Sequence, residues 1–234
     1  MSAPAPDVSV VIPVIDEAAA IGALIAGVRA QFERLGVRCE VLAVDGGSKD
    51  GTPERAAAAG ARVLRQAGPG YGAALAEGFA AAAGAYVLTM DGDGSHSPEA
   101  VPALWARRAE AEVVVGSRLV EGGGLDETPA ARVVLSRVLN EFFRRVLGFP
   151  VRDSSSGYRL YRAGPVKAVR VRARGFDAQQ DILLAIVDAG GRAVEVPIRY
   201  VWRKDGVSKA SIGASGPGYL RLAGRRLARL WRRP

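Results

Sequence analysis

Short runs of β-branched residues alternate along this chain with longer segments in which apolar residues recur every three or four positions. Residues 8–14 form a continuous apolar run, which is typical of a strand buried on both faces of a parallel sheet. Residues 17–35 follow with one apolar stripe that runs from Ile21 to Phe32, which predicts an amphipathic helix.

The same alternation continues as far as residue 117. The further strands that it predicts are residues 40–44, 62–64, 86–90 and 113–117. The further helices are residues 52–59, 70–83 and 98–109. Strands and helices in this order predict right-handed β-α-β units, and hence a single α/β domain with a mostly parallel central sheet flanked by helices.

The pattern is weaker after residue 118. We expect a flexible loop over residues 121–129 and a polar loop, a candidate lid, over residues 202–215. Between and beside them, the pattern predicts helices over 131–147 and 179–189, a strand-like segment late in 153–162, and a strand over 192–197.

Four residues of possible chemical interest fall at the carboxyl ends of predicted strands, where open α/β sheets bind their ligands. They are Pro13, Asp45, Asp91 and Arg118. The sequence therefore predicts a binding crevice at this edge of the sheet.

The strand over 86–90 leads directly into Asp91 and Asp93, with Gly92 and Gly94 beside them. The glycines let the chain turn sharply, so that both carboxylates can face one point. Mg²⁺ typically uses one or two carboxylates together with substrate phosphates. The pattern favours a metal–diphosphate site, although the same residue types are also common in surface turns.

Composition narrows the class of protein. The chain has 234 residues, a net charge of +8, one cysteine (Cys39) and one histidine (His96). One cysteine excludes an internal disulfide framework and is typical of a reducing cytoplasm. There is no secretory signal and no apolar run long enough to span a membrane.

Much of the positive charge lies in residues 219–234, which contain six arginines and no acid. Leu220, Leu227 and Trp231 share a helical face there, and Arg221 and Arg225 lie opposite. A basic amphipathic helix of this kind favours peripheral contact with an anionic membrane surface. A solvated terminus is the plain alternative, and nucleic-acid binding is disfavoured because no base-stacking aromatics interleave with the arginines.

Several motifs occur in an order that resembles the glycosyltransferase family 2 enzymes of GT-A fold, and within them the dolichol-phosphate and polyprenol-phosphate mannosyltransferases. The matching stretches are VSVVIPVIDE (8–17), VLAVDGGSKDGT (41–52), GPGYGAALAEGF (68–79), MDGDGSHSPE (90–99), VVGSR (114–118), SRVLN (136–140), RDSSSGYRLYR (152–162), GFDAQQDILL (175–184) and VWRKDGVSK (201–209). They cover about residues 8–210, so we expect a GT-A domain over residues 1–218 followed by the basic tail over 219–234.

The resemblance implies an inverting, metal-dependent transfer of a hexose from a nucleotide diphosphate sugar to polyprenyl phosphate, with mannose from GDP-mannose as the first candidate and Mg²⁺ or Mn²⁺ as the metal. It also implies a place on the cytoplasmic face of the membrane. The residues that it assigns to donor, sugar or metal are Pro13, Ile15, Glu17, Val44, Asp45, Asp91, Gly92, Asp93, Arg118, Arg203 and Lys209.

Within that set, Asp93 is implied as the metal ligand with Asp91 in support, Arg118 as a donor contact, and Arg203 with Lys209 as the basic pair of a closing loop. Ile15, Gly46 and Gly94 depart from the family pattern, which has an aromatic residue, Asp and Leu there. Nucleotide and sugar recognition are the properties most affected by these departures.

Weaker candidates accompany this set, and each has a structural alternative. His96 is either a site residue or the cap of the next helix, and Asp153 and Asp181 are candidates for orienting groups near the acceptor. Gln179 and Arg137 are structural or acceptor-side candidates. In the main set, Asp45 has an alternative as a turn cap and Glu17 as a first-turn helix acid.

Two rival functions stay open at this point. One is transfer of another sugar, for example glucose from UDP-glucose, to a lipid phosphate or to a non-lipid acceptor. The other is nucleotide-sugar binding without turnover, which the intact Asp91/Asp93 pair and the Arg203/Lys209 pair disfavour.

Overall fold

The computed structural model describes residues 4–202 and 212–231. Its main sheet has seven strands in the order β3-β2-β1-β4-β7-β5-β8. These strands are β1 (Val8–Val14), β2 (Cys39–Asp45), β3 (Arg62–Arg65), β4 (Tyr86–Thr89), β5 (Val113–Ser117), β7 (Arg159–Arg162) and β8 (Ala193–Pro197). Only β7 runs antiparallel to its neighbours, so the prediction of a mostly parallel sheet is confirmed.

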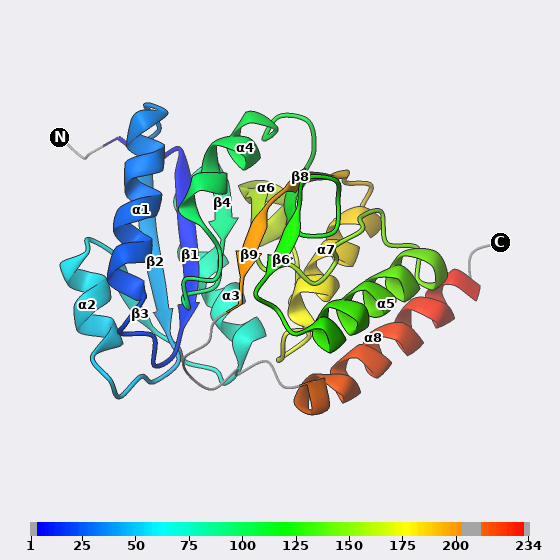
Figure 1. The fold of residues 1–234 in the computed structure, drawn as a ribbon. Helices are drawn as coiled ribbons and strands as arrows, with labels where there is room; N and C mark the ends of the chain where they lie inside the picture. Colours follow the sequence, from blue (N-terminus) through cyan, green and yellow to red (C-terminus); the bar gives the residue numbers. More distant parts are fainter. Residues whose placement is uncertain (1–3, 203–211, 232–234) are drawn as a thin grey trace.

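Helices cover both faces of this sheet (Figure 1). They are α1 (Ile21–Arg34), α2 (Thr52–Ala58), α3 (Tyr71–Ala81), η1 (Pro98–Ala100), α4 (Val101–Ala106), α5 (Ala130–Val146), α6 (Ala163–Lys167), α7 (Ala178–Asp188) and α8 (Ile212–Trp231). The helices α1, α2 and α4 share one apolar core with the sheet, whereas α3, α5, α6, α7 and α8 share the other.

The alternation of side chains along β1 explains why its sequence is apolar throughout. Val10 and Ile12 belong to the core on the α1 side, Val11 belongs to the core on the α3 side, and all three are fully buried. Helix α3 approaches this strand closely, because a Cβ at Gly78 would lie 2.3 Å from Val11 Cγ1.

A second sheet pairs β6 (Gly124–Asp126) with β9 (Arg199–Val201). The prediction of a flexible loop over residues 121–129 is therefore wrong at its centre. The two strands are far apart in the sequence, and an ion pair joins Arg199 to Asp126. The short, polar, glycine-rich sequence of residues 121–129 shows neither the strand pairing nor the ion pair.

The predicted helix over residues 17–35 begins only at Ile21. The backbone N–H of Asp16 donates to Ser48 Oγ and that of Ala18 donates to Asp50 Oδ2, which holds this segment against the loop after β2 instead of in a helix. The other predicted boundaries differ from the observed ones by a few residues, most at the helix predicted to end at 109, where α4 ends at Ala106.

The polar loop predicted over residues 202–215 gives way to α8 at Ile212, and Arg203 and Lys209 lie outside the described residues. None of the helices in the described part of the chain has the length and apolar character needed to cross a bilayer.

Candidate active site

The chain brings four segments together at one edge of the main sheet. The parallel strands β1, β4 and β5 end there, and the antiparallel β7 begins there. The loop over residues 152–158, which precedes β7, therefore reaches the same edge as the acidic pair after β4. These segments border a cavity of about 620 Å³.

Asp91 lies in the wall of this cavity with its carboxylate held from two sides. Tyr71 Oη donates a hydrogen bond of 2.9 Å to Asp91 Oδ1, and Gln179 Nε2 donates one of 2.7 Å to Tyr71 Oη. The backbone of Gly157 passes so close that a Cβ there would lie 2.9 Å from Asp91 Oδ1. Any larger residue at position 157 would displace the carboxylate.

Burial raises the pKa of the Asp91 carboxyl, and the negative charge of Asp93 raises it further. His96 acts in the opposite direction and lowers this pKa. Two carboxylates that repel each other in a partly desolvated cavity are stabilised by a cation between them. Asp93 Oδ1 accepts hydrogen bonds from the backbone N–H (3.0 Å) and the hydroxyl (2.6 Å) of Ser95.

These observations fit a hard divalent cation. No group of three or more His, Cys, Asp or Glu side chains converges in the described residues, so within them a cation beside Asp91 and Asp93 would have few protein ligands. A Mg²⁺-like ion held by so few protein ligands takes its remaining ligands from phosphate oxygens and water. The donor set is that of a metal shared with a diphosphate.

His96 is buried beside this pair and also lines the cavity. Its Nδ1 accepts a 3.4 Å hydrogen bond from the backbone N–H of Asp91, and burial lowers the pKa of its imidazole. The alternative role as a helix cap is wrong for His96, because Ser97 Oγ accepts the backbone N–H of Glu99 at the start of η1.

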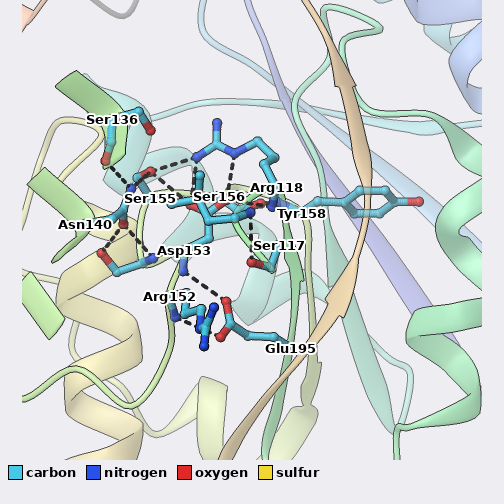
Figure 2. A network of polar contacts seen from close by, with 12 residues as sticks. Ser117, Arg118, Ser136, Asn140, Arg152, Asp153, Ser155, Ser156, Tyr158 and Glu195 are labelled. Carbon is cyan, nitrogen blue, oxygen red and sulfur yellow. Dashed lines mark hydrogen bonds and ion pairs between the residues drawn. The ribbon is translucent and has the colours of Figure 1, made fainter. Parts of the chain in front are cut away.

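Arg118 and Asp153 form a bidentate ion pair at the end of β5 (Figure 2). Arg118 Nε and Nη2 each lie 2.7 Å from an oxygen of the Asp153 carboxylate, and Nη2 also donates to Ser155 Oγ at 2.8 Å. Burial alone would raise the pKa of Asp153, but the Arg118 guanidinium outweighs it and holds this pKa below its ordinary value. No hydrogen bond within the described structure uses Arg118 Nη1, which leaves those protons for a ligand in the cavity.

A network of polar contacts fixes the loop that carries Asp153 (Figure 2). The Glu195 carboxylate on β8 accepts the backbone N–H groups of Arg152 (2.8 Å) and Asp153 (3.0 Å). Asn140 of α5 accepts the backbone N–H of Ser154 at 2.8 Å and donates to Ser155 Oγ at 3.1 Å. Asp153 thus orients Arg118, which agrees with the orienting role expected for it, and whether that role concerns the acceptor stays a prediction.

The buried Arg159 side chain supports the same loop. It donates to the carbonyls of Ser154 (2.5 Å), Ser156 (2.8 Å) and Gln179 (2.5 Å), so one guanidinium ties the loop before β7 to the start of α7. Sequence reasoning missed Tyr71, Asn140 and Arg159 as supporting residues. Their only signal was their position inside the GPGYG, SRVLN and SGYRLYR motifs.

The predicted donor residues divide into two groups. Cavity-lining residues from the predicted set are Pro13, Ile15, Glu17, Asp91, Gly92, Asp93 and Arg118. Val44 is buried in the core, and Asp45 caps its own turn by accepting the backbone N–H groups of Gly47 and Ser48. Neither Val44 nor Asp45 lines the cavity, and a donor contact stays a prediction for both.

The structure also shows which of the weaker candidates lie near the cavity. Gln179 supports Tyr71, as described above, whereas Arg137 is exposed on α5 and does not line the cavity. Asp181 accepts the backbone N–H of Arg172 and pairs with Arg225 at 3.0 Å, on the wall of a different groove. Asp181 therefore does not line the cavity that contains Asp91 and Asp93, and an acceptor-side role for it stays a prediction.

The cavity continues from the acidic pair to an apolar end between α5, α7 and α8. Leu135, Leu139 and Phe143 of α5 and Tyr219 of α8 line this end. Arg132 and Trp202 also line the cavity, and the Arg132 guanidinium lies 4.5 Å from the centre of the Trp202 ring. One cavity therefore joins a polar, acidic compartment to an apolar one.

This combination of an α/β sheet, a carboxylate pair at a strand end and a cavity with both acidic and apolar lining is that of a nucleotide-sugar transferase. The sequence model described as "Glycosyl transferase family 2" matches residues 9–170, and the chain belongs to this family. The chain is 35% identical over 204 residues to the undecaprenyl-phosphate mannosyltransferase of Micrococcus luteus, covering 82% of this chain and 84% of that one. It is 39% identical over 185 residues to the polyprenol monophosphomannose synthase of Mycolicibacterium smegmatis, covering 73% and 70%.

Solved structures confirm the GT-A fold. Mannosyl-3-phosphoglycerate synthase from Rubrobacter xylanophilus superposes with a TM-score of 0.77 at 20% identity, covering 97% of this chain and 76% of that one. Glucosyl-3-phosphoglycerate synthase from Mycobacterium tuberculosis, in complex with Mn²⁺, UDP-glucose and phosphoglyceric acid, gives 0.73 at 23% identity, covering 94% and 79%. At these identities the likeness concerns the fold alone.

Proposed function

We propose that this chain transfers a hexose, with mannose from GDP-mannose as the first candidate, to the phosphate of a polyprenyl phosphate on the cytoplasmic face of a membrane. The observation that carries the proposal is the lining of the cavity, which includes the Asp91/Asp93 pair and the apolar residues Leu135, Leu139 and Phe143. A nucleotide diphosphate fits the first and an isoprenoid chain the second. The names of the two curated relatives agree with this acceptor.

The reaction is an in-line displacement. An oxygen of the lipid phosphate forms a bond to the anomeric carbon, the bond from that carbon to the diphosphate oxygen breaks, and the nucleoside diphosphate leaves with the electron pair. The configuration at the anomeric carbon inverts. The acceptor phosphate is already ionised near neutral pH, so the reaction needs no strong general base.

Asp93, with Asp91 beside it, is the proposed holder of Mg²⁺ or Mn²⁺. Bound there, the ion would stabilise the charge that develops on the departing diphosphate. Arg118, held by Asp153, lines the same cavity and is proposed to donate its unused Nη1 protons to the diphosphate; such a fixed donor typically contributes about 3 kcal/mol to transition-state stabilisation. Arg203 and Lys209, which lie between β9 and α8 in the sequence, are proposed to add positive charge.

The experiment supplies each radiolabelled donor, GDP-mannose or UDP-glucose, together with polyprenyl phosphate, with and without Mn²⁺. Label that enters the lipid only from GDP-mannose and only with the metal supports the proposal. Label from UDP-glucose alone identifies the glucosyl alternative, and binding of a donor without any product refutes transfer to a lipid phosphate.

The basic tail is proposed as the peripheral membrane contact. Leu220 and Trp231 of α8 are 76% and 91% exposed, as expected for residues that face a bilayer. Deleting residues 219–234 is a poor test, because Leu222 and Arg226 in the same segment are buried against the body of the protein. Substituting Leu220 and Trp231 by Asp tests the contact without uncovering the core.

A further inference from the structure

The side chain of Gln180 is buried in the wall of the cavity without a hydrogen bond. Gln180 is the third residue of α7, its exposed fraction is 0%, and it lines the same cavity as Asp91 and Asp93. Within the described residues, neither its Nε2 nor its Oε1 has a hydrogen-bond partner. The other buried side-chain atoms without a partner there are one nitrogen each of His96 and Arg162, so only Gln180 contributes two.

An unpaired amide of this kind is costly to bury. A glutamine amide has two N–H donors and one carbonyl acceptor, and burial removes the water that would pair with them. The protein gains nothing in return unless other polar groups take the place of that water. Most buried polar groups in proteins are paired, so an exception in the wall of a cavity indicates a ligand.

Tyr219 is the candidate for an internal partner of Gln180. Burial raises the pKa of the Tyr219 hydroxyl, and the Gln180 amide acts in the opposite direction, so the two groups lie close together. They do not have the geometry of a hydrogen bond. A small rotation that joined them would pair a single hydroxyl with one end of the amide and leave the other end unpaired. The amide therefore keeps capacity for a ligand.

Gln180 lies between the acidic and the apolar parts of the cavity. The residue before it, Gln179, belongs to the chain of hydrogen bonds that holds the Asp91 carboxylate. Tyr219, which lies close to Gln180, has its ring 5.6 Å from the ring of Phe143 in the apolar part. In the proposed reaction, the sugar lies between the diphosphate of the donor and the phosphate of the acceptor. This is the region that Gln180 borders.

The two unpaired ends of the amide indicate hydroxyl groups as its ligand. A phosphate near neutral pH offers mainly acceptors, so it would pair with Nε2 and place negative charge beside Oε1. A sugar hydroxyl both donates and accepts, and two neighbouring hydroxyls would pair with both ends of the amide. Arg118, which lines the same cavity, is the side chain suited to phosphate.

We infer that Gln180 binds hydroxyl groups of the hexose of the donor and thereby contributes to the selection of the sugar. The inference rests on the proposed function for the presence of a nucleotide-bound hexose, but it does not depend on the acceptor. The terminal torsion of a glutamine side chain has a broad energy well, so the amide can turn towards the sugar, and it gives up no internal hydrogen bond when it does. A donor without the matching hydroxyls leaves the amide unpaired and is disfavoured.

The test replaces the amide by apolar side chains of similar size, in Gln180→Leu and Gln180→Met. Gln179→Leu is the matched control, because it makes the same change at the adjacent residue, whose amide supports Tyr71. Calorimetry in Mn²⁺ measures the affinity of each protein for GDP-mannose and for GDP, which lacks the hexose. UDP-glucose and UDP form a second pair of ligands. Urea denaturation of the unliganded proteins measures their stability.

We expect both Gln180 variants to bind GDP-mannose about tenfold more weakly than the wild type and to bind GDP equally well, as for the loss of one or two hydrogen bonds to the sugar. Gln179→Leu should weaken the binding of both ligands by the same factor, since it acts on the carboxylate that is proposed to hold the metal–diphosphate. The Gln180 variants should unfold at urea concentrations no lower than the wild type, because they remove two unpaired buried polar atoms.

A ratio of the two affinities that is unchanged in both Gln180 variants would overturn the inference. A lower urea midpoint in those variants would then assign the amide to an internal hydrogen bond. A wild type that binds neither nucleotide sugar would overturn the inference together with the proposed function.

The same titrations separate this inference from the proposed function. A preference for GDP-mannose over GDP that depends on Gln180, in a protein that transfers no sugar to polyprenyl phosphate, would support the inference and refute the transfer. The same dependence for UDP-glucose over UDP would support the inference and identify the glucosyl donor. Transfer of mannose by a protein in which Gln180 does not affect this preference would support the proposed function and refute the inference.

Discussion

The hydroxyl of Tyr71 lies 2.9 Å from Oδ1 of Asp91 and donates a hydrogen bond to it. Tyr71 is the first residue of α3, and its ring stacks on Phe176 with centroids 4.7 Å apart. The same hydroxyl accepts a hydrogen bond from Gln179 on α7. The Asp91 carboxylate is thus oriented by residues of two helices, α3 and α7.

Replacing Tyr71 by Phe should impair the site while leaving the fold intact. The stacked ring is retained, but Asp91 loses a donor and the buried Gln179 amide loses its acceptor. We expect kcat/KM to fall by about tenfold and apparent metal affinity to fall by a similar factor, as for other residues that orient metal ligands. Steady-state kinetics over a series of Mn²⁺ concentrations measures both.

Tyr86→Phe is the control for this variant, because Tyr86 lies at the other end of β4, packed on Trp105. The role assigned to Tyr71 would be wrong if both variants kept the metal dependence of the wild type.

Asp153→Asn should destabilise the protein at neutral pH, because it removes one partner of a buried ion pair. Removing one partner of a buried ion pair typically lowers the free energy of unfolding by about 3 kcal/mol. Chemical denaturation at pH 7 measures the loss. Glu141→Gln is the control, because its exposed pairs with Arg144 and Arg145 should contribute little.

The effect of Asp153→Asn should also depend on pH. The folded-state pKa of Asp153 is held below its ordinary value of 3.8, so its contribution is fully present above that value and is lost as the pH falls through the folded pKa. Thermal melts between pH 3 and pH 7 should therefore show the difference between wild type and Asp153→Asn shrinking below about pH 4. A difference that stays constant over this range would show that the ion pair does not supply the stability.

Arg226→Ala should loosen α8 from the body. Arg226 and Asp188 are both at least nine-tenths buried, and removing the cation leaves the Asp188 carboxylate in that environment. We expect a loss of roughly 3 kcal/mol, measured by urea denaturation, whereas Arg221→Ala on the exposed side of α8 should be close to neutral. Equal stability of the two variants would show that α8 is not held by this pair.

The alternation of strands and helices up to residue 117 was predictable from sequence because each element has its own apolar period. The acidic pair was predictable for a related reason, since a buried strand that ends in two carboxylates separated by glycines is a local pattern. The mostly parallel α/β sheet and the position of Asp91, Asp93 and Arg118 around one cavity follow from these local signals, whereas the GT-A fold was implied by the resemblance to the family.

The features that sequence reasoning missed depend on long-range pairing. Strand β6 forms only because β9, which begins 73 residues further on, pairs with it through Arg199 and Asp126. The segment before α1 is not helical because Ser48 and Asp50 bind its backbone. Asp181 turns away from the cavity because Arg225 of α8 lies on the other side, and a single α7 segment contains no sign of that partner.

The most direct test of the account is calorimetric titration of Mn²⁺, in the presence of GDP, into the wild type and into Asp93→Asn. The account predicts that the wild type binds the metal and that Asp93→Asn, with its fold unchanged by circular dichroism, binds it at least about tenfold more weakly. Equal affinity in the two proteins would contradict the claim that the carboxylates after β4 hold the metal–diphosphate.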